Sequence, residues 1–167
     1  MPQLAFTMQT QQQTNWCWAA VSASNSSFFG GPSGPSGGPW QQCEVAQCAL
    51  PGNPGCCGQP MPATCNQDWY LEQGLTCVSH LAGPVTAGPS LYPNIKTEIN
   101  NSHPVGVRIG WYGDGGHFVC VTGYDDSTGT QFVNVDDPYY GPSTYEYNAF
   151  CTAYQSAGSW THTYPIA

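Results

Sequence analysis

The spacing of hydrophobic positions changes about halfway along the chain. Near the start, apolar residues recur at helical spacing after Asn15, an acceptable N-cap, and predict a helix over residues 16–28. Gly30-Gly31-Pro32 ends this helix, and a surface loop rich in Gly, Pro and Ser follows over residues 32–39. Three shorter helical segments are predicted further along, over residues 44–48, 66–73 and 92–100.

Beyond residue 100 the period becomes that of strands. Residues 104–112 alternate between apolar and other side chains, whereas residues 117–124 are apolar on both faces, as a central strand should be. A turn over residues 125–129 leads to a strand over residues 131–137, which Pro138 ends. Two further strands are predicted, near residues 144–151 and 158–164. A helical first part followed by an antiparallel sheet is typical of an α+β domain.

The charge balance excludes two classes of partner. Charged residues make up 7% of the chain, against roughly 25% in an ordinary globular protein. Lys96 and Arg108 are the only lysine and arginine, and ten carboxylates bring the net charge to −8. A nucleic acid would find almost no cations to neutralise its phosphates, and an anionic membrane surface would repel the chain. We therefore expect neither partner.

The nine cysteines in 167 residues indicate an oxidising compartment, and we expect a secreted protein. Because nine is odd, four disulfides would leave one thiol free. Adjacent Cys56 and Cys57 are expected to tie two different segments to one point. Cys77 and His80 have zinc-ligand spacing, but such sites favour reducing compartments, so we expect no metal and no cofactor. The first residues lack the basic and apolar regions of a signal peptide, which suggests a mature form whose leader has been removed.

Cys17 is the candidate nucleophile. It falls in the first turn of the predicted helix, where free backbone N–H groups and the helix dipole stabilise a thiolate. Because lysine and arginine are so scarce, we expect the helix start and a histidine to activate the thiol. The alternative is that Cys17 is half of a disulfide or a buried apolar residue, and the odd cysteine count favours the nucleophile.

His117 is the candidate base, because a nucleophilic thiol needs one within hydrogen-bond reach. It follows two glycines and begins the most apolar strand of the chain, where a buried imidazole requires a partner. The alternative is a strand-end histidine that is bonded to a carbonyl. The other three histidines, His80, His103 and His162, stand beside loop residues or near the C-terminus, and we expect them to be solvated.

A third residue must orient the imidazole. If the two neighbouring strands form a hairpin folded about Ser127, residue 137 lies opposite His117, and Asp137 would accept a hydrogen bond from the far ring nitrogen. A slightly earlier fold favours Asp136, and spacing alone does not fix the register. Asn134 is a weaker candidate, and the acidic pair would otherwise only cap the strand end.

Acyl transfer also needs donors for the developing oxyanion. The backbone N–H of Cys17, at the helix start, is one candidate. An upstream glutamine side chain is the other, and three stand close together: Gln11, Gln12 and Gln13. In so polar a segment, each of them would otherwise simply be solvated.

Three segments, taken together in this order, resemble papain-like cysteine peptidases. They are Gln11-x5-Cys17-Trp18-Ala19-Ala20, Gly116-His117-Phe118-Val119 with Gly123-Tyr124, and Asp137-Pro138. The chain is most similar to the compact bacterial branch related to bacteriocin-leader peptidases and secreted plant-pathogen effector proteases. It departs from plant papain in having Asn-Trp-Cys-Trp in place of the Cys-Gly-Ser-Cys-Trp signature, and aspartate in place of the usual asparagine.

The resemblance implies a two-lobed α+β fold in one catalytic domain, residues 1–167. The nucleophile helix and the cysteine-rich segment belong to a lobe of about residues 15–100, and a barrel-like antiparallel sheet forms a lobe of about residues 101–167. The domain would be braced by disulfides, with the substrate between the lobes.

The resemblance also assigns roles to four residues. It implies Cys17 as nucleophile, His117 as general base and acid, Asp137 as the orienting carboxylate and Gln11 in the oxyanion hole. The implied function is that of a secreted, monomeric cysteine endopeptidase that hydrolyses protein or peptide substrates through a thioester. The alternatives are a papain-fold amidase, a protein deamidase or an acyltransferase and, in another class, a non-catalytic binding module.

Overall fold

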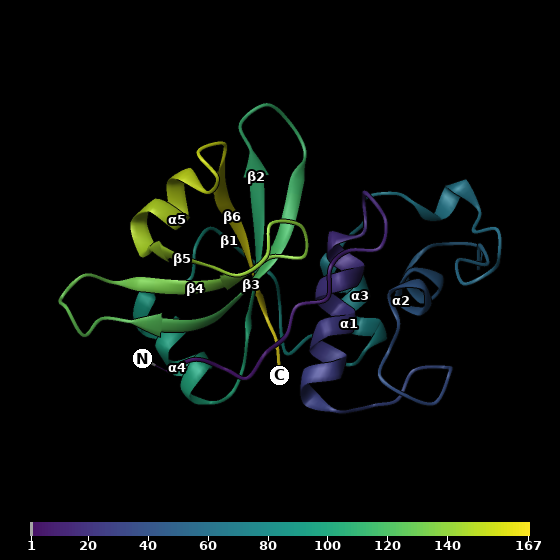
Figure 1. The fold of residues 1–167 in the computed structure, drawn as a ribbon, viewed down its shortest axis with the longest axis horizontal. Coiled ribbons are helices and arrows are strands. Elements are labelled where there is room, and N and C mark those ends of the chain that lie inside the picture. The colour runs from purple at the N-terminus through teal and green to yellow at the C-terminus, as the bar shows by residue number, and fades with distance from the viewer. Residues whose placement is uncertain (1) are drawn as a thin grey trace.

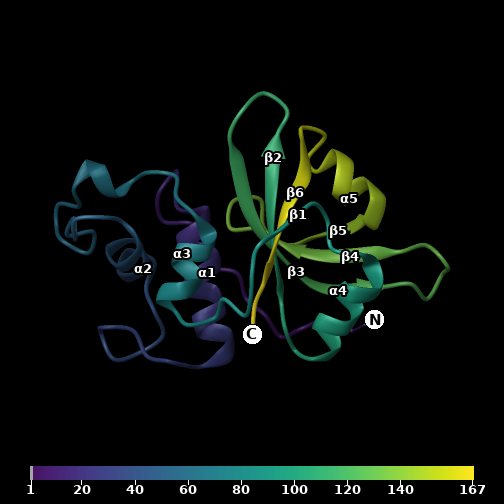
Figure 2. The ribbon, with the colours of Figure 1, turned by 180° about the vertical axis from the view of Figure 1, so that it is seen from behind.

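The structure is a computed structural model, and it describes residues 2–167. Figures 1 and 2 show one side of the molecule that is mostly helical and another that is built on a sheet. The helical side contains α1 (Cys17–Phe29), α2 (Gln42–Ala49), η1 (Ala63–Cys65) and α3 (Leu71–Cys77). The sheet side contains two further helices, α4 (Tyr92–Asn100) and α5 (Tyr147–Ala153). The predicted α+β class is confirmed.

The sheet is open and has six strands, in the order β1-β6-β2-β3-β4-β5, with every neighbouring pair antiparallel. The strands are β1 (Thr86–Ala87), β2 (Val105–Trp111), β3 (Gly116–Asp125), β4 (Phe132–Asp136), β5 (Ser143–Glu146) and β6 (Gly158–Pro165). The expectation of a barrel-like sheet is wrong, because β1 and β5 do not pair with each other. These edge strands have two and four residues, too few to close the sheet.

The segment predicted as a strand over residues 144–151 divides into strand β5 and helix α5. The Glu146 carboxylate accepts hydrogen bonds from the backbone N–H groups of Asn148 and Ala149, at 3.2 and 3.1 Å. This side-chain cap satisfies two donors of a starting helix, so the chain turns into α5 although its sequence also suits a strand.

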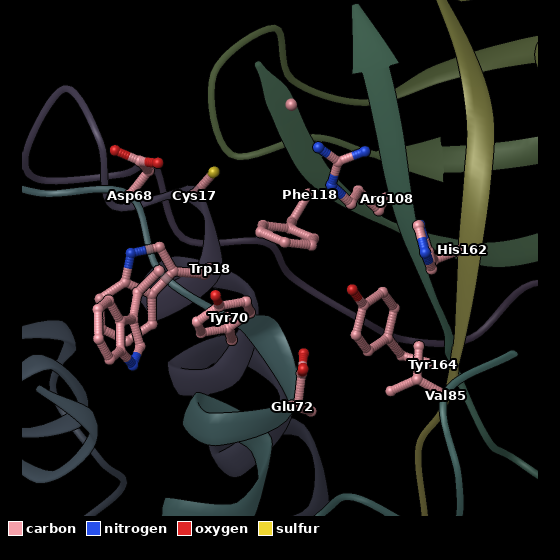
Figure 3. Close-up of a pocket in the computed structure, with 12 residues that line it drawn as sticks. Cys17, Trp18, Asp68, Tyr70, Glu72, Val85, Arg108, Phe118, His162 and Tyr164 are labelled. Atoms are coloured by element: carbon pink, nitrogen blue, oxygen red, sulfur yellow. The ribbon is translucent and has the colours of Figure 1, made fainter. Parts of the chain in front are cut away.

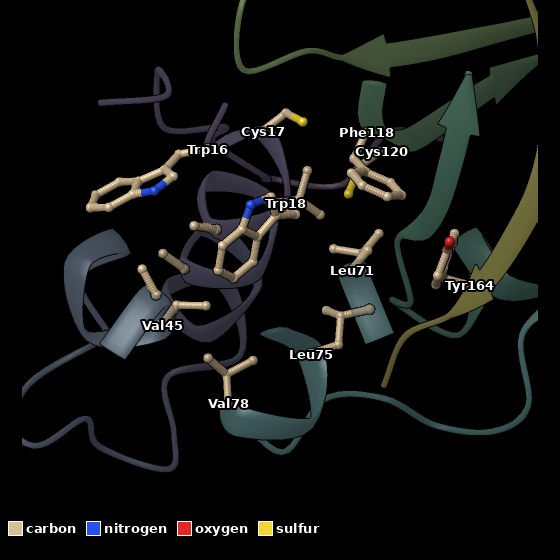
Figure 4. Packing of buried hydrophobic residues seen from close by; sticks show 14 of the residues in the cluster. Trp16, Cys17, Trp18, Val45, Leu71, Leu75, Val78, Phe118, Cys120 and Tyr164 are labelled. Atoms are coloured by element: carbon tan, nitrogen blue, oxygen red, sulfur yellow. The ribbon is translucent and has the colours of Figure 1, made fainter. Parts of the chain in front are cut away.

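Helix α1 is the buried centre of the helical side, and residues 17–26 are buried without interruption. Helices α2 and α3 contact it, and so does strand β3. Figure 4 shows Trp18 among Val45, Leu71 and Leu75. Two buried serines of α1 donate within the helix, Ser22 to the Trp18 carbonyl at 2.8 Å and Ser24 to the Ala20 carbonyl at 2.6 Å. Because neighbouring elements enclose α1, the residue at its first position is held firmly in place.

Strand β3 lies between two hydrophobic clusters, because successive side chains of a strand point to opposite faces. Phe118 and Cys120 belong to the cluster around α1. Val119 and Val121 belong to the cluster that α4 and α5 help to enclose on the other face. The strand is therefore central, as its sequence predicts.

Three disulfides link segments of the helical side to one another: Cys43–Cys57, Cys48–Cys77 and Cys56–Cys65. Adjacent Cys56 and Cys57 pair with two different segments, as expected. The expectation of four bridges and one free thiol is wrong, because Cys17, Cys120 and Cys151 are all free. Cys120 and Cys151 lie in different clusters, on opposite faces of the sheet, and cannot meet. No helix among the described residues is both long and apolar enough to cross a membrane.

The disulfide pattern predicts the outcome of thiol mapping. After denaturation without reduction, iodoacetamide should alkylate three cysteines, Cys17, Cys120 and Cys151, and peptide mass mapping should find the other six protected until a reductant is added. In the native protein Cys120, which has no exposed surface, should resist the reagent. Alkylation of a single cysteine in the denatured, unreduced protein would restore a fourth bridge and contradict this pattern.

Candidate active site

Cys17 is the first residue of α1, which places its backbone N–H among those with no acceptor in the helix. The cap position is Trp16, not the predicted Asn15, and no side chain caps the helix there. Asn15 instead bonds to Asn66, with its backbone N–H and its side-chain amide each at 3.1 Å. The uncapped donors and the dipole give this helix start a positive potential next to the Cys17 side chain.

His117, near the start of β3, is held between two partners. Its Nε2 lies 2.9 Å from the Asp137 Oδ1, and the Cys17 side chain is close enough to the ring to raise its pKa. The imidazole is buried, and the Trp111 indole stacks on it with ring centres 5.9 Å apart and planes 18° apart. The structure thus brings Cys17, His117 and Asp137 together in one chain of contacts.

Burial alone would lower the pKa of His117, because it disfavours the charged imidazolium. The hydrogen bond to Asp137, the negative charge of that carboxylate and the proximity of Cys17 outweigh burial and raise the pKa to about 9. The site therefore stabilises a protonated imidazole beside the sulfur at neutral pH.

Asp137 is fixed by four hydrogen bonds. Besides the imidazole, its Oδ1 accepts from the backbone N–H groups of Tyr139 and Tyr140, at 2.6 and 2.9 Å. Its Oδ2 accepts from the buried Tyr154 hydroxyl at 2.6 Å. Burial by itself would raise the pKa of Asp137, but these bonds and the charge of His117 lower it below the usual value. The carboxylate is thus ionised and cannot easily turn away from the ring.

Asp136 and Asn134 do not reach His117. Asp136 is on the opposite face of the sheet from Asp137, where its Oδ2 accepts from the Thr122 hydroxyl at 2.7 Å. Asn134 bonds to Thr144, whose hydroxyl donates to it at 3.0 Å. Of the three acidic or amide candidates, the structure places only Asp137 at the imidazole.

The observed register of β3 and β4 differs from the register predicted for a hairpin folded about Ser127. Cys120 is opposite Asp136, and the register shifts at a bulge between Val121 and Gly123. Continued to the strand end, this pairing would put residue 139, not residue 137, opposite His117. The difference is two residues, so Asp137 stays on the same face as His117 and reaches it diagonally.

Gln11 lines the small cavity of about 220 Å³ that Cys17 and His117 also line. Its Nε2 donates to the carbonyls of Gln13 and Thr14, at 2.9 and 2.8 Å, whereas its Oε1 is buried without a partner. Both amide hydrogens are therefore used within its own loop. Gln12 is not among the residues that line this cavity, and its backbone N–H donates to the Gln42 side chain at 2.9 Å.

One of the other histidines, His80, is not solvated as expected. His80 is buried, with its ring nitrogens 2.8 Å from the Ala167 carbonyl and 2.7 Å from the Gly31 carbonyl. His162 lines a larger cavity beside Cys17. The burial of His80 could not be read from its loop-like neighbours in the sequence.

Sequence reasoning missed Trp111 and Tyr154 as supports of this site. Trp111 follows the alternating apolar pattern of its strand, so its face was predictable, although its stacking on His117 was not. Tyr154 comes directly after α5, in a stretch with no predicted element, and nothing in the local pattern points to Asp137. Within the described residues, no three metal-ligating side chains converge.

The site geometry predicts the titration of His117. Asp137→Asn should lower the pKa of His117 well below about 9, because the buried imidazolium loses its counter-charge while burial still disfavours it. Asp136→Asn, on the other face, is the matched control and should leave the titration unchanged. NMR of the imidazole carbon resonances across pH measures both. An equal change in the two variants would contradict the assignment.

One comparison with known proteins matches nearly the whole chain to a family. A protein-family model described as the Peptidase_C39 like family matches residues 3–166, which is nearly the full length and includes every residue of the site above. A search among curated proteins found no match.

Proposed function

Because the chain belongs to the Peptidase_C39-like family, we propose that it is a secreted, papain-like cysteine endopeptidase. The observation that supports this most is the alignment of Cys17, His117 and Asp137, with the imidazole between a sulfur and a fixed carboxylate. A nucleophile, a base and a group that orients the base are the three parts that covalent acyl transfer requires. We also propose that, among papain-like peptidases, the chain is related to the branch of bacteriocin-leader peptidases and secreted plant-pathogen effector proteases.

In the proposed reaction the Cys17 thiolate attacks a peptide carbonyl, and the bond to the leaving amine breaks after His117 gives that amine its proton. This step leaves the acyl group on Cys17 as a thioester. His117, now neutral, removes a proton from water, and the resulting hydroxide attacks the thioester. The acid product departs and Cys17 returns as the thiolate paired with protonated His117.

The developing oxyanion needs donors next to Cys17. We assign the first to the backbone N–H of Cys17, which has no helical acceptor. We assign the second to Gln11, on the strength of its place in the same cavity and of the resemblance described above. In the free protein its N–H groups bond to Gln13 and Thr14, so the assignment requires its amide to turn when substrate binds.

Three disulfides suggest an oxidising, extracellular environment, and this supports the proposal of a secreted protein. We propose that the helical side and the sheet side are the two lobes of one catalytic domain. The substrate would lie between them, where the cavities beside Cys17 are found. Amidase, deamidase and acyltransferase reactions share the same thioester and differ in the group that enters or leaves.

Replacement of the nucleophile tests the proposal. Cys17→Ala should reduce peptide hydrolysis by at least about a thousandfold, because no other group can form the thioester. Cys151→Ala removes a free thiol on the far face of the sheet and is the matched control, with activity expected to be unchanged. A proteome-derived peptide library, analysed by mass spectrometry, measures cleavage by all three proteins. Undiminished cleavage by Cys17→Ala would contradict the mechanism, and absence of cleavage by the unmodified enzyme would favour the non-catalytic module.

A further inference from the structure

The larger cavity beside Cys17 contains a cation that the proposed chemistry does not use. The cavity has a volume of about 630 Å³ and lies between the helical side and the sheet (Figure 3). Besides Cys17, it is lined from the sheet by Arg108, Phe118 and Tyr164, and from the helical side by Trp18, Tyr70 and Glu72. A group that binds here would therefore lie beside the reactive sulfur.

The Arg108 guanidinium is held in place at this cavity. Its Nη1 donates to the Thr161 hydroxyl at 3.0 Å. Its plane lies against Gly116, where an added Cβ would come within 2.8 Å of Nη2. Because Gly116 has no side chain, the guanidinium can rest directly next to the residue that precedes His117.

Arg108 has no carboxylate partner among residues 2–167, although the chain has ten carboxylates. The other cation, Lys96, forms a 2.6 Å ion pair with Asp126. A guanidinium has five N–H donors, and Thr161 accepts from one of its nitrogens. Arg108 is half-buried, and a partly desolvated cation without a counter-charge is costly. Its remaining donors suit an anion that arrives with a ligand.

Glu72, on the opposite wall, limits where such an anion can bind. Burial and Glu72 raise the pKa of Tyr164 to about 12, whereas Arg108 acts in the opposite direction. The two charges thus act on the same cavity from different walls. An anionic ligand is attracted toward the sheet and repelled from the helical side.

We infer that this cavity binds a carboxylate of the substrate and that Arg108 is the residue that selects it. The inference rests on the proposed function, because it takes the cavity to hold the peptide next to Cys17. The planar guanidinium can bind a carboxylate through two parallel hydrogen bonds, which distinguishes it from an amide of the same size. The carboxylate is an acidic side chain near the scissile bond or the free C-terminus of a short peptide.

Peptide binding to the inactive Cys17→Ala protein tests this without requiring catalysis. The probes are fluorescein-labelled positional-scanning peptides with amidated C-termini and either Glu or Gln at each position in turn. A second set contains Gln only and ends in a free carboxylate. Fluorescence anisotropy should show Glu favoured over Gln at one position by about ten- to hundredfold, the range for a hydrogen bond to a charged group. The same preference for the free C-terminus alone would identify that end as the source of the carboxylate.

Three variants, each made in the Cys17→Ala protein, separate the role of Arg108 from general charge. Arg108→Gln should abolish the preference, and Arg108→Lys should retain part of it, because the charge remains but the two-bond geometry is lost. Lys96→Gln removes the other cation, far from the cavity lining, and should leave the preference intact. Equal binding of the Glu, the amidated Gln and the free-C-terminus peptides, no binding of either carboxylate set, or a preference that survives Arg108→Gln would overturn the inference.

Cleavage assays with the intact enzyme distinguish failure of this inference from failure of the proposed function. Hydrolysis of both carboxylate sets and of the amidated Gln peptides at equal kcat/KM would overturn the role of Arg108 and leave the peptidase assignment in place. A carboxylate preference in binding, without hydrolysis of any bound peptide, would support the role of Arg108 and contradict the peptidase assignment.

Discussion

The arrangement of the site depends on one buried charged pair, His117 and Asp137. Burial of two charges is favourable only when their attraction and further hydrogen bonds offset the loss of water. Asp137 meets this condition, since two backbone N–H groups and the Tyr154 hydroxyl share its oxygens with the imidazole. These bonds tie together strand β3, the turn after β4 and the end of α5, and they hold the ring toward the start of α1.

The scarcity of lysine and arginine explains which groups provide positive charge at the site. A protein with two lysine or arginine residues cannot surround a thiolate with them, so the start of α1 and a protonated His117 provide the positive field at Cys17. Of the two cations, Lys96 is paired with Asp126, and Arg108 is left for the cavity beside the sulfur. The three disulfides brace the segments that pack around α1, including α2 and α3.

Sequence patterns predicted the helices and strands that follow a local hydrophobic period. They failed where contacts between distant segments determine the structure. Helix α4 was predicted with its observed bounds, and the strands around His117 nearly so. The hairpin folded about Ser127 is two residues in error; because the error is even, Asp137 still lies on the face of His117, and the resemblance rather than the spacing favoured it over Asp136. The Glu146 cap, the contact of Tyr154 with Asp137 and the three disulfides all depend on tertiary packing, which no local pattern records.

The central claim is that Cys17 attacks the substrate with His117 as its base, and a trapped intermediate tests it most directly. A peptide that the enzyme cleaves can be mixed with it and quenched in acid before the steady state, and the protein then digested and analysed by mass spectrometry. The account predicts the N-terminal part of the substrate attached to Cys17 through a bond that hydroxylamine breaks, as a thioester requires. Cleavage with no adduct at any time, or an adduct on another residue, would contradict it.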